Sequence, residues 1–229
     1  MYFKNNCKED SIRGGIDYMN SKIKQVSVSR DIRIYVDSQL NWKEHCNYIR
    51  GKINKLSYAL YMLQKIVGLT TLRTAYLAQV ESLLRYGVVF WGNSTEKDQI
   101  FKAQKKCIRA ICKIRITDSC KTHFINLKLL TFPCLYILES ITFIKCNIHE
   151  FEFFQSHRNS HKICHPSSKT ALLKNSYLSM AIRMYVILPK DVLKINNKQQ
   201  FKNKVKAILL EKAYYDVRDF LADNAIVVK

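Results

Sequence analysis

The cysteine and histidine residues between positions 146 and 165 have side chains that could bind a metal ion. Thiolate and imidazole ligands placed about two to four residues apart can hold Zn²⁺ in a tetrahedral site. The candidates are Cys146, His149, His161 and Cys164. Their spacing is irregular and the chain has no CxxC pair, so a polar loop that collects histidines is the favoured interpretation. We predict no metal site and no cofactor, and keep a zinc-stabilised loop as an alternative.

His45 is the second residue whose neighbours could give it a chemical role. Asp37 and Trp42 precede it, and a carboxylate could orient the imidazole ring. However, His45 falls at the fourth position of a predicted helix, and Leu40 falls just before the helix cap. These are the positions of a hydrophobic staple. We therefore predict that His45 packs against other side chains.

Acidic side chains do not form a pattern that would support catalysis. Polymerases and nucleases that use two metal ions need clustered carboxylates to hold Mg²⁺. The 18 aspartate and glutamate residues are scattered among lysines, and no two aspartates are adjacent. Glycine-rich phosphate loops are also excluded, because the chain has only 6 glycines. We predict that the chain is not an enzyme and has no small-molecule substrate.

Basic side chains gather on one side of a helix predicted from Thr95 to about Arg115. At about 100° per residue, an apolar side of this helix lies opposite a side of five cations. We call these five the basic face: Lys102, Lys105, Lys106, Arg109 and Lys113. No acid occurs between Lys102 and Arg115, whereas solvated helix faces usually mix charges of both signs. The pattern favours contact with nucleic-acid phosphates over a plain solvated face or an acidic membrane surface, and Lys52 and Lys55 are further candidates.

The composition agrees with a helical, nucleic-acid-binding protein. Glycine and proline number only 6 and 3 in 229 residues, which removes the main turn-forming residues of β-sandwiches and barrels. The formal net charge is +20, and phosphate polymers are natural partners of such a surface. The first residues lack the apolar segment of a secretory signal peptide, and no window is apolar enough to cross a membrane. We expect an intracellular location, cytoplasmic or nuclear.

Periodicity predicts the elements that carry these residues. Residues 1–27 are expected to form a loose leader. Ile32, Ile34 and Val36 alternate as in one short strand. A capping box from Asn41 to Glu44 is expected to start a helix, whose apolar stripe reaches Gly68 and is made of Ile49, Ile53, Leu56, Leu60, Leu63 and Val67.

A second helix is predicted to be capped by Thr70 or Thr71 and to end near the segment from Tyr86 to Gly92. Four aromatic residues are assigned to packing: Trp42, Tyr86, Phe90 and Trp91. After the third helix, prolines and polar clusters delimit helices near 120–131, 134–150, 172–187 and 199–221. The predicted fold class is all-α, a helical bundle with one short β segment near the N-terminus. The predicted parts are a thumb-like bundle over 28–116 and a C-terminal helical region over 117–229.

Five segments, in order along residues 28–221, resemble one known family. They are YVDSQLNWKEH (35–45), LLRYGVVFWG (83–92), QKKCIRAI (104–111), LKLLTFPCLYILE (127–139) and YVILP (185–189). The chain resembles the region that follows the polymerase palm in jockey-type non-LTR retrotransposon reverse transcriptases, which are RNA-directed DNA polymerases. This transposable-element resemblance implies thumb helices that grip an RNA or RNA–DNA duplex through its backbone.

The chain also departs from this family. The catalytic aspartates and the fingers of the family lie upstream of anything matched here, so the resemblance implies a fragment without polymerase activity. The family usually has Leu-Gly where this chain has Ile32-Arg33, and Asn where it has Val186. These changes suggest a truncated element copy, either functional or inert. A palm domain in trans, or a second copy of the chain, are the protein partners that this interpretation implies.

Overall fold

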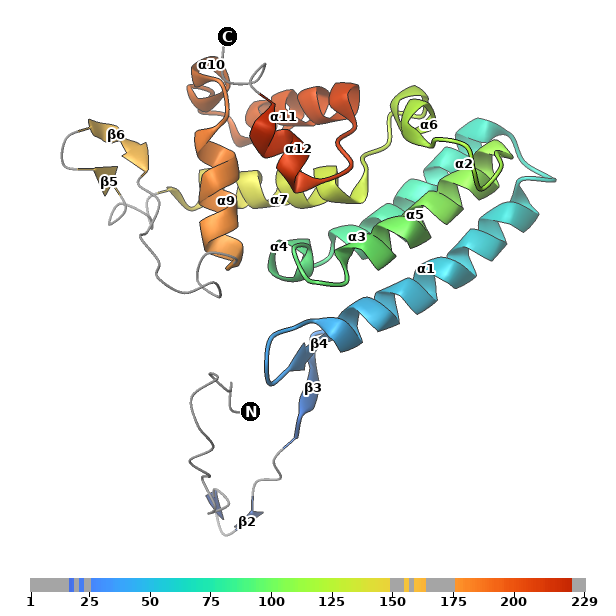
Figure 1. The fold of residues 1–229 in the computed structure, drawn as a ribbon, viewed down its shortest axis with the longest axis horizontal. Coiled ribbons are helices and arrows are strands. Elements are labelled where there is room, and N and C mark those ends of the chain that lie inside the picture. The colour runs from blue at the N-terminus through green and yellow to red at the C-terminus, as the bar shows by residue number, and fades with distance from the viewer. Residues whose placement is uncertain are drawn as a thin grey trace.

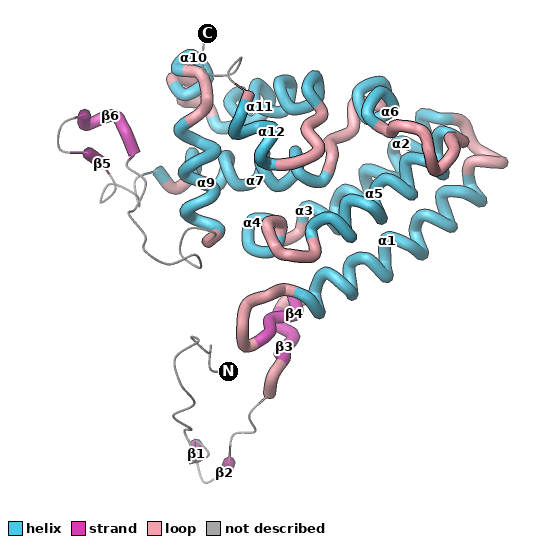
Figure 2. Tube along the Cα trace, viewed as in Figure 1, coloured by secondary structure: helices cyan, strands magenta, loops and turns pink. Residues whose placement is uncertain are grey.

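The computed structural model describes residues 17–18, 21–22, 26–148, 155–156, 159–163 and 176–223 (Figure 1). Most of the predicted leader therefore lies outside the described residues. Helices dominate the described part of the chain (Figure 2), and a short antiparallel pair of strands precedes the first helix. The predicted all-α class with a short β segment near the N-terminus is confirmed.

The β segment is a hairpin, whereas a single strand was expected. β3 (Val28–Asp31) pairs antiparallel with β4 (Ile34–Asp37). Ile32 and Arg33 form the turn with φ angles of 43° and 63°. Two-residue hairpin turns with positive φ match the twist of the strands and favour Asn-Gly or similar pairs. The prediction that Ile32 lies in the strand is wrong, and its side chain is 75% exposed. Two shorter antiparallel pairs join β1 (Asp17–Tyr18) to β2 (Ser21–Lys22) and β5 (Gln155–Ser156) to β6 (Asn159–Ile163).

The first helix, α1 (Lys43–Leu63), begins without the predicted capping box. Trp42 takes the cap position with a left-handed φ of 62°, and no side-chain cap bond is formed. Instead, the carboxylate of Asp37, at the end of β4, accepts hydrogen bonds from the backbone N–H groups of Asn41 (2.9 Å) and Trp42 (2.7 Å). Asp37 therefore fixes the backbone that leads into α1, and no side chain caps the first turn of the helix. The apolar stripe is confirmed at its centre, where Ile49, Ile53 and Leu60 are buried; Leu63 is exposed, and Val67 follows the end of α1.

The second helix is continuous but changes its winding. It comprises α2 (Leu69–Tyr76), the π-helical turn η1 (Leu77–Glu81) and α3 (Ser82–Arg85). Gly68 occupies its N-cap, so the predicted threonine cap is wrong. The expected tight turn follows Arg85: Gly87 has φ 63° and starts the short helix α4 (Val88–Trp91). At Gly92, a side chain would collide with the ring of Tyr136 and the carbonyl oxygen of Val88.

The third helix, α5 (Lys97–Cys112), is shorter than predicted because Lys113 turns the chain with φ 54°. Its apolar side is buried, as expected. Gln104 lies on that side, and its amide joins three elements. Its Nε2 donates to the Tyr76 hydroxyl (2.8 Å) and to the Leu130 carbonyl (2.9 Å), and its Oε1 accepts from the Phe132 N–H (2.7 Å).

Six helices follow α5 in the described part of the chain. They are α6 (Lys121–Asn126), α7 (Phe132–Cys146), α9 (Tyr177–Val186), α10 (Lys190–Leu193), α11 (Lys198–Lys212) and α12 (Val217–Ala222). The helix predicted over 199–221 is interrupted, because Ala213 adopts φ 44° and Asp216 begins α12 with its own capping box. The Thr131 hydroxyl donates to the Tyr214 carbonyl (2.6 Å) and anchors this interruption to the start of α7.

Helix α7 lies at the centre of the fold. It packs against α3, α4 and α5 and also against α9 and α11. Helix α1 packs chiefly along α5 and forms one edge of the body in Figure 1. The buried side chains of both predicted parts, 28–116 and 117–229, belong to one hydrophobic cluster. The division between these parts stays a prediction, and the two share a core.

Candidate nucleic-acid interface

The basic face divides into exposed cations and cations that are held by the protein. Lys102 and Lys106 are exposed on α5, and Lys113 is exposed at its C-terminal end. Lys105 and Arg109 are half-buried. Burial of Ile100, Cys107 and Ile111 on the opposite side fixes the rotation of the helix. The helix therefore directs Lys102 and Lys106 to solvent.

Lys105 is held by two aromatic rings. Its Nζ lies 4.6 Å from the ring centroid of Phe101 and 5.5 Å from that of Tyr215, which lies between α11 and α12. A cation over a ring face is attracted by the ring quadrupole, by about 0.5–1 kcal/mol at exposed sites. Lys105 therefore helps to fix the segment that follows α11, and only part of its charge is open to a ligand.

Arg109 is held by the loop that follows α5. Its Nε donates to the carbonyl of Arg115 (3.3 Å) and its Nη2 to the carbonyl of Asp118 (3.3 Å). The side chain of Arg115 forms an ion pair with Asp118 at 3.7 Å. These contacts shape the turn between α5 and α6, so Arg109 has a structural role besides any contact with a ligand.

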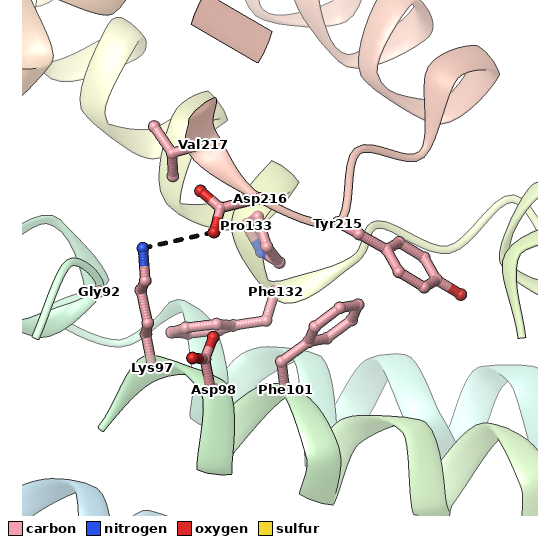
Figure 3. Close-up of a pocket in the computed structure, with 9 residues that line it drawn as sticks. All are labelled: Gly92, Lys97, Asp98, Phe101, Phe132, Pro133, Tyr215, Asp216 and Val217. Carbon is pink, nitrogen blue, oxygen red and sulfur yellow. Dashed lines mark ion pairs between the residues drawn. The ribbon is translucent and has the colours of Figure 1, made fainter. Parts of the chain in front are cut away.

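Acidic groups bracket the basic face at both ends. Asp98 lies one turn before Lys102, and Asp118 lies beyond Lys113. Lys97 and Asp216 form an ion pair at 3.7 Å across a shallow depression between α5 and the segment that leads into α12 (Figure 3). The rings of Phe101, Phe132 and Tyr215 line this depression. Lys97 and Asp216 neutralise each other, so the remaining charged side chain of the lining is the carboxylate of Asp98.

The further candidates Lys52 and Lys55 are exposed on α1. The Nζ of Lys52 lies 4.8 Å from the ring centroid of Tyr48, and a hydrogen bond from Lys52 lowers the pKa of the Tyr48 hydroxyl. Neither lysine forms an ion pair with an acidic side chain of the described residues. Sequence reasoning identified these lysines but not Tyr58 and Tyr61, which are exposed on the same helix.

The buried carboxylate of Glu81 and the half-buried carboxylate of Glu139 are paired with cations. Glu81, in the π-helical turn, forms an ion pair with Arg85 at 2.6 Å. Arg85 also pairs with Glu139 of α7, and Lys202 of α11 lies 3.2 Å from the same carboxylate. Each carboxylate thus already has its counter-charge. This network of ion pairs connects α3, α7 and α11, so its role is to hold these helices together.

His45 and Asp37 do not form a catalytic pair. The Asp37 carboxylate binds the backbone before α1, while His45 is buried with its ring 5.2 Å from that of Trp91. Its Nδ1 accepts from the Tyr35 N–H at 3.4 Å. Burial lowers the pKa of His45 to about 4. The predicted packing role of His45 is confirmed, although its partner is Trp91 and the expected staple residue, Leu40, is 41% exposed.

The cysteine and histidine candidates for zinc lie mostly outside the described residues. Cys146 is half-buried at the end of α7, and nothing is described of the side chains of His149, His161 and Cys164. Within the described residues, no group of three or more potential ligands could hold a metal ion. Burial raises the pKa of Cys107 to about 12 and that of Cys134 to about 11, so these thiols stay protonated at neutral pH.

Comparisons with known proteins identify no relative: no family model, no curated protein and no solved structure matches this chain. Among the described residues, no helix has the length and apolar character to span a membrane.

Proposed function

We propose that this chain binds the backbone of an RNA or RNA–DNA duplex with little sequence preference. The observation that carries the proposal is the exposure of Lys102, Lys106 and Lys113 along one side of α5, with the apolar side of that helix buried. Lys102 and Lys113 are separated by about 16 Å at ~1.5 Å per residue. A nucleic-acid strand carries a charge about every 3.4 Å along its axis. The row is long enough to meet several phosphates of one strand.

Such binding would be electrostatic and tolerant of sequence. Lysine side chains contact phosphates as point charges and release condensed counterions. The three exposed candidates on and beside α5 are lysines, which recognise the charge of a phosphate and not the edge of a base. Lys105 and Arg109, which are half-buried, would add to the positive electrostatic potential around α5. Lys52 and Lys55 would add to it from α1.

We further propose that the chain is a fragment of a jockey-type non-LTR retrotransposon reverse transcriptase that covers its thumb and the region behind it. The motif resemblance supports this origin, and the hairpin turn is compatible with it. Arg33 has a positive φ, which suits the glycine that the family usually has there. The fragment would have no polymerase activity of its own, since the catalytic aspartates of the family belong to the palm. A cytoplasmic or nuclear location would give it access to nucleic acid.

A second candidate function is docking of a protein, as expected of an otherwise inert remnant. Tyr86 and Phe90, assigned to packing from the sequence, are 44% and 47% exposed. The Tyr86 hydroxyl donates to the carbonyl of the exposed Ile32 (2.7 Å), and the Phe90 ring contacts that of Tyr177 at 5.2 Å. Exposed apolar side chains that lie together often mark interaction sites. A palm domain supplied in trans or a second copy of the chain would be the partner.

The decisive experiment for the first proposal is duplex binding across a salt series. The test variant changes Lys102, Lys106 and Lys113 to glutamine. We expect the slope of log affinity against log salt to shrink by about one for each phosphate that the variant no longer neutralises, so by up to about three. The measurement is fluorescence anisotropy with a labelled RNA–DNA duplex.

A matched control variant has the same net charge as the test variant. It changes three exposed lysines near α10 and α11 to glutamine: Lys194, Lys198 and Lys204. The control should keep the slope of the wild type, because these lysines lie on other helices. If the slope shrinks equally in both variants, binding depends on overall charge and the assignment to α5 is wrong.

A further inference from the structure

Helix α1 carries a second basic surface that differs in composition from the basic face of α5. Six side chains follow one another at intervals of three or four residues, so each is the helical neighbour of the next. We call them the tyrosine–lysine row: Tyr48, Lys52, Lys55, Tyr58, Tyr61 and Lys65. Lys65 lies just past the last residue of α1. The row crosses the outer side of the helix diagonally, away from the buried Ile49, Ile53 and Leu60.

The rings at the centre of this row are unusually exposed. Tyr58 is 67% exposed and Tyr61 is 49% exposed. Tyrosine in a solvated helix usually covers a neighbour with its ring, because the ring is largely apolar. Tyr58 and Tyr61 are three residues apart, so their rings lie on adjacent turns of the same side. They form a platform that the described part of the chain does not cover.

Cations lie next to two of the three rings of the row, those of Tyr48 and Tyr61. Lys65 Nζ lies 5.2 Å from the ring centroid of Tyr61, and Lys52 Nζ lies 4.8 Å from that of Tyr48. Arg30 of the β3–β4 hairpin extends the row at its N-terminal end, with its guanidinium 6.0 Å from the Tyr48 centroid. Lysine and tyrosine side chains therefore lie together over about 20 Å from Tyr48 to Tyr61, at ~1.5 Å per residue.

The charge of this surface is of one sign. No aspartate or glutamate occurs between Glu44 and Glu81. Among the described residues, the three lysines of the row form no ion pair. An ordinary solvated helix would mix signs through pairs at i and i+4. The surface is therefore complementary to a polyanion.

We infer that the tyrosine–lysine row binds a single-stranded segment of nucleic acid by stacking unpaired bases on Tyr58 and Tyr61 and pairing phosphates with Lys52, Lys55 and Lys65. Proteins that bind single strands without sequence preference combine a positive track with aromatic stacking platforms. A duplex is a poor fit, because the faces of its bases are already stacked on one another and cannot stack on a tyrosine ring. At ~3.4 Å per stacked nucleotide, the roughly 20 Å from Tyr48 to Tyr61 corresponds to about six nucleotides.

An anionic membrane is the other polyanion to consider, and it fits less well. A helix that lies in the lipid interface needs a broad apolar face directed toward the lipid. The aliphatic stripe of α1 is buried in the body of the protein. Exposed aliphatic side chains occur at the α1–α2 tip, at Met62, Leu63 and Ile66, but none belongs to the row.

The test uses the full chain and four probes. They are a twelve-nucleotide oligothymidine, an abasic strand of the same length, a duplex of the same length, and vesicles of equal parts phosphatidylserine and phosphatidylcholine. The test variant is the double change Tyr58→Ala and Tyr61→Ala. Loss of about 1–3 kcal/mol per stacked base corresponds to at least about 30-fold weaker binding of oligothymidine. Binding of the duplex should stay within about twofold.

Two controls separate stacking from general effects. The double change Tyr58→Phe and Tyr61→Phe keeps the ring faces and should bind oligothymidine like the wild type. The abasic strand keeps the phosphates, should bind the wild type weakly, and should not distinguish the alanine variant. Circular dichroism should be the same for all variants, because both rings are exposed.

The outcome separates this inference from the proposed function. The variant with Lys102, Lys106 and Lys113 changed to glutamine should still bind oligothymidine, even if duplex binding by α5 is wrong. Equal binding of oligothymidine by the wild type and the alanine variant would overturn the inference while leaving duplex binding in place. Vesicle binding that depends on the tyrosines, without binding of oligothymidine, would also overturn it and would assign the surface to a membrane.

Discussion

Gln104 gives the sharpest test of how this fold is held together. Its amide makes three hydrogen bonds, all buried, between α5, the end of α2 and the segment that enters α7. The change Gln104→Met keeps the length and most of the volume of the side chain. It leaves the Phe132 N–H and the Leu130 carbonyl without their amide partner. Any loss of stability can then be assigned to the polar groups and not to a cavity.

The expected loss can be worked out from these partners. A buried donor or acceptor left unpaired costs about 1–3 kcal/mol. The Phe132 N–H and the Leu130 carbonyl are backbone groups that cannot turn toward water, whereas the Tyr76 hydroxyl can rotate. We therefore expect Gln104→Met to reduce the free energy of unfolding by about 2–4 kcal/mol. Gln104→Ala should lose about 1–2 kcal/mol more, because it also creates a cavity.

The assay is equilibrium unfolding in urea, followed by circular dichroism and tryptophan fluorescence. Trp91 is buried within the same core and reports on it. Tyr76→Phe is the matched control: it removes one hydrogen bond and leaves the amide with the Leu130 carbonyl and the Phe132 N–H, so its loss should stay near 1 kcal/mol or below. A loss below about 1 kcal/mol for Gln104→Met would refute the argument that this amide links the three elements.

Two further predictions concern single residues of the core. His45 is neutral in the fold because burial lowers its pKa to about 4. As the pH falls below about 6.5, the histidine takes up a proton in the unfolded chain but not in the folded one. The free energy of unfolding should therefore fall by about 3 kcal/mol between pH 6.5 and pH 4. His45→Phe should remove this part of the pH dependence, and parallel wild-type and variant curves of unfolding free energy between pH 4 and 7 would contradict the assignment. Gly92→Ala should lower stability by about 1–3 kcal/mol, because the added methyl meets the buried Tyr136 ring and the Val88 carbonyl. Gly51→Ala is the control, because an added methyl meets nothing within 4 Å there. It should raise the thermal midpoint, since alanine favours the helix more than glycine does. A loss of stability of similar size in both variants would show that packing at Gly92 is not the cause.

The buried sides of the helices could be predicted from sequence, whereas the helix ends could not. Apolar periodicity correctly placed Ile49, Ile53 and Cys107 in the core, because packing against neighbours is what selects those residue types. The predicted capping box of α1 is wrong because Trp42, and not Asn41, takes the cap position, in a left-handed conformation that the sequence pattern did not indicate. The interruption at Ala213 carries no glycine or proline, and its anchor, Thr131, lies 83 residues before Tyr214. Signals that depend on such distant partners are invisible to a local pattern.

The same limit applies to the candidate interface. Helical spacing correctly placed Lys102 and Lys106 on the exposed side of α5, opposite the buried Ile100 and Cys107. It could not show that Tyr215 covers Lys105 or that the carbonyls of Arg115 and Asp118 hold Arg109, since these partners reach α5 only in the folded chain. No prediction was made for Tyr58 and Tyr61, because the exposure of a tyrosine beside an aliphatic stripe depends on where the neighbouring helices lie.

The hydrogen bond between the Thr131 hydroxyl and the Tyr214 carbonyl has a consequence for folding during translation. On the ribosome, residues 43–146 emerge well before the partner of Thr131 has been synthesised. The buried surface of α7 that α11 and α12 later cover is then open to water and to other nascent chains. Loops of this length close slowly compared with local helix formation. Final consolidation of the core must therefore wait until the last described helix has left the exit tunnel, and before that point the growing chain is a natural client for chaperones.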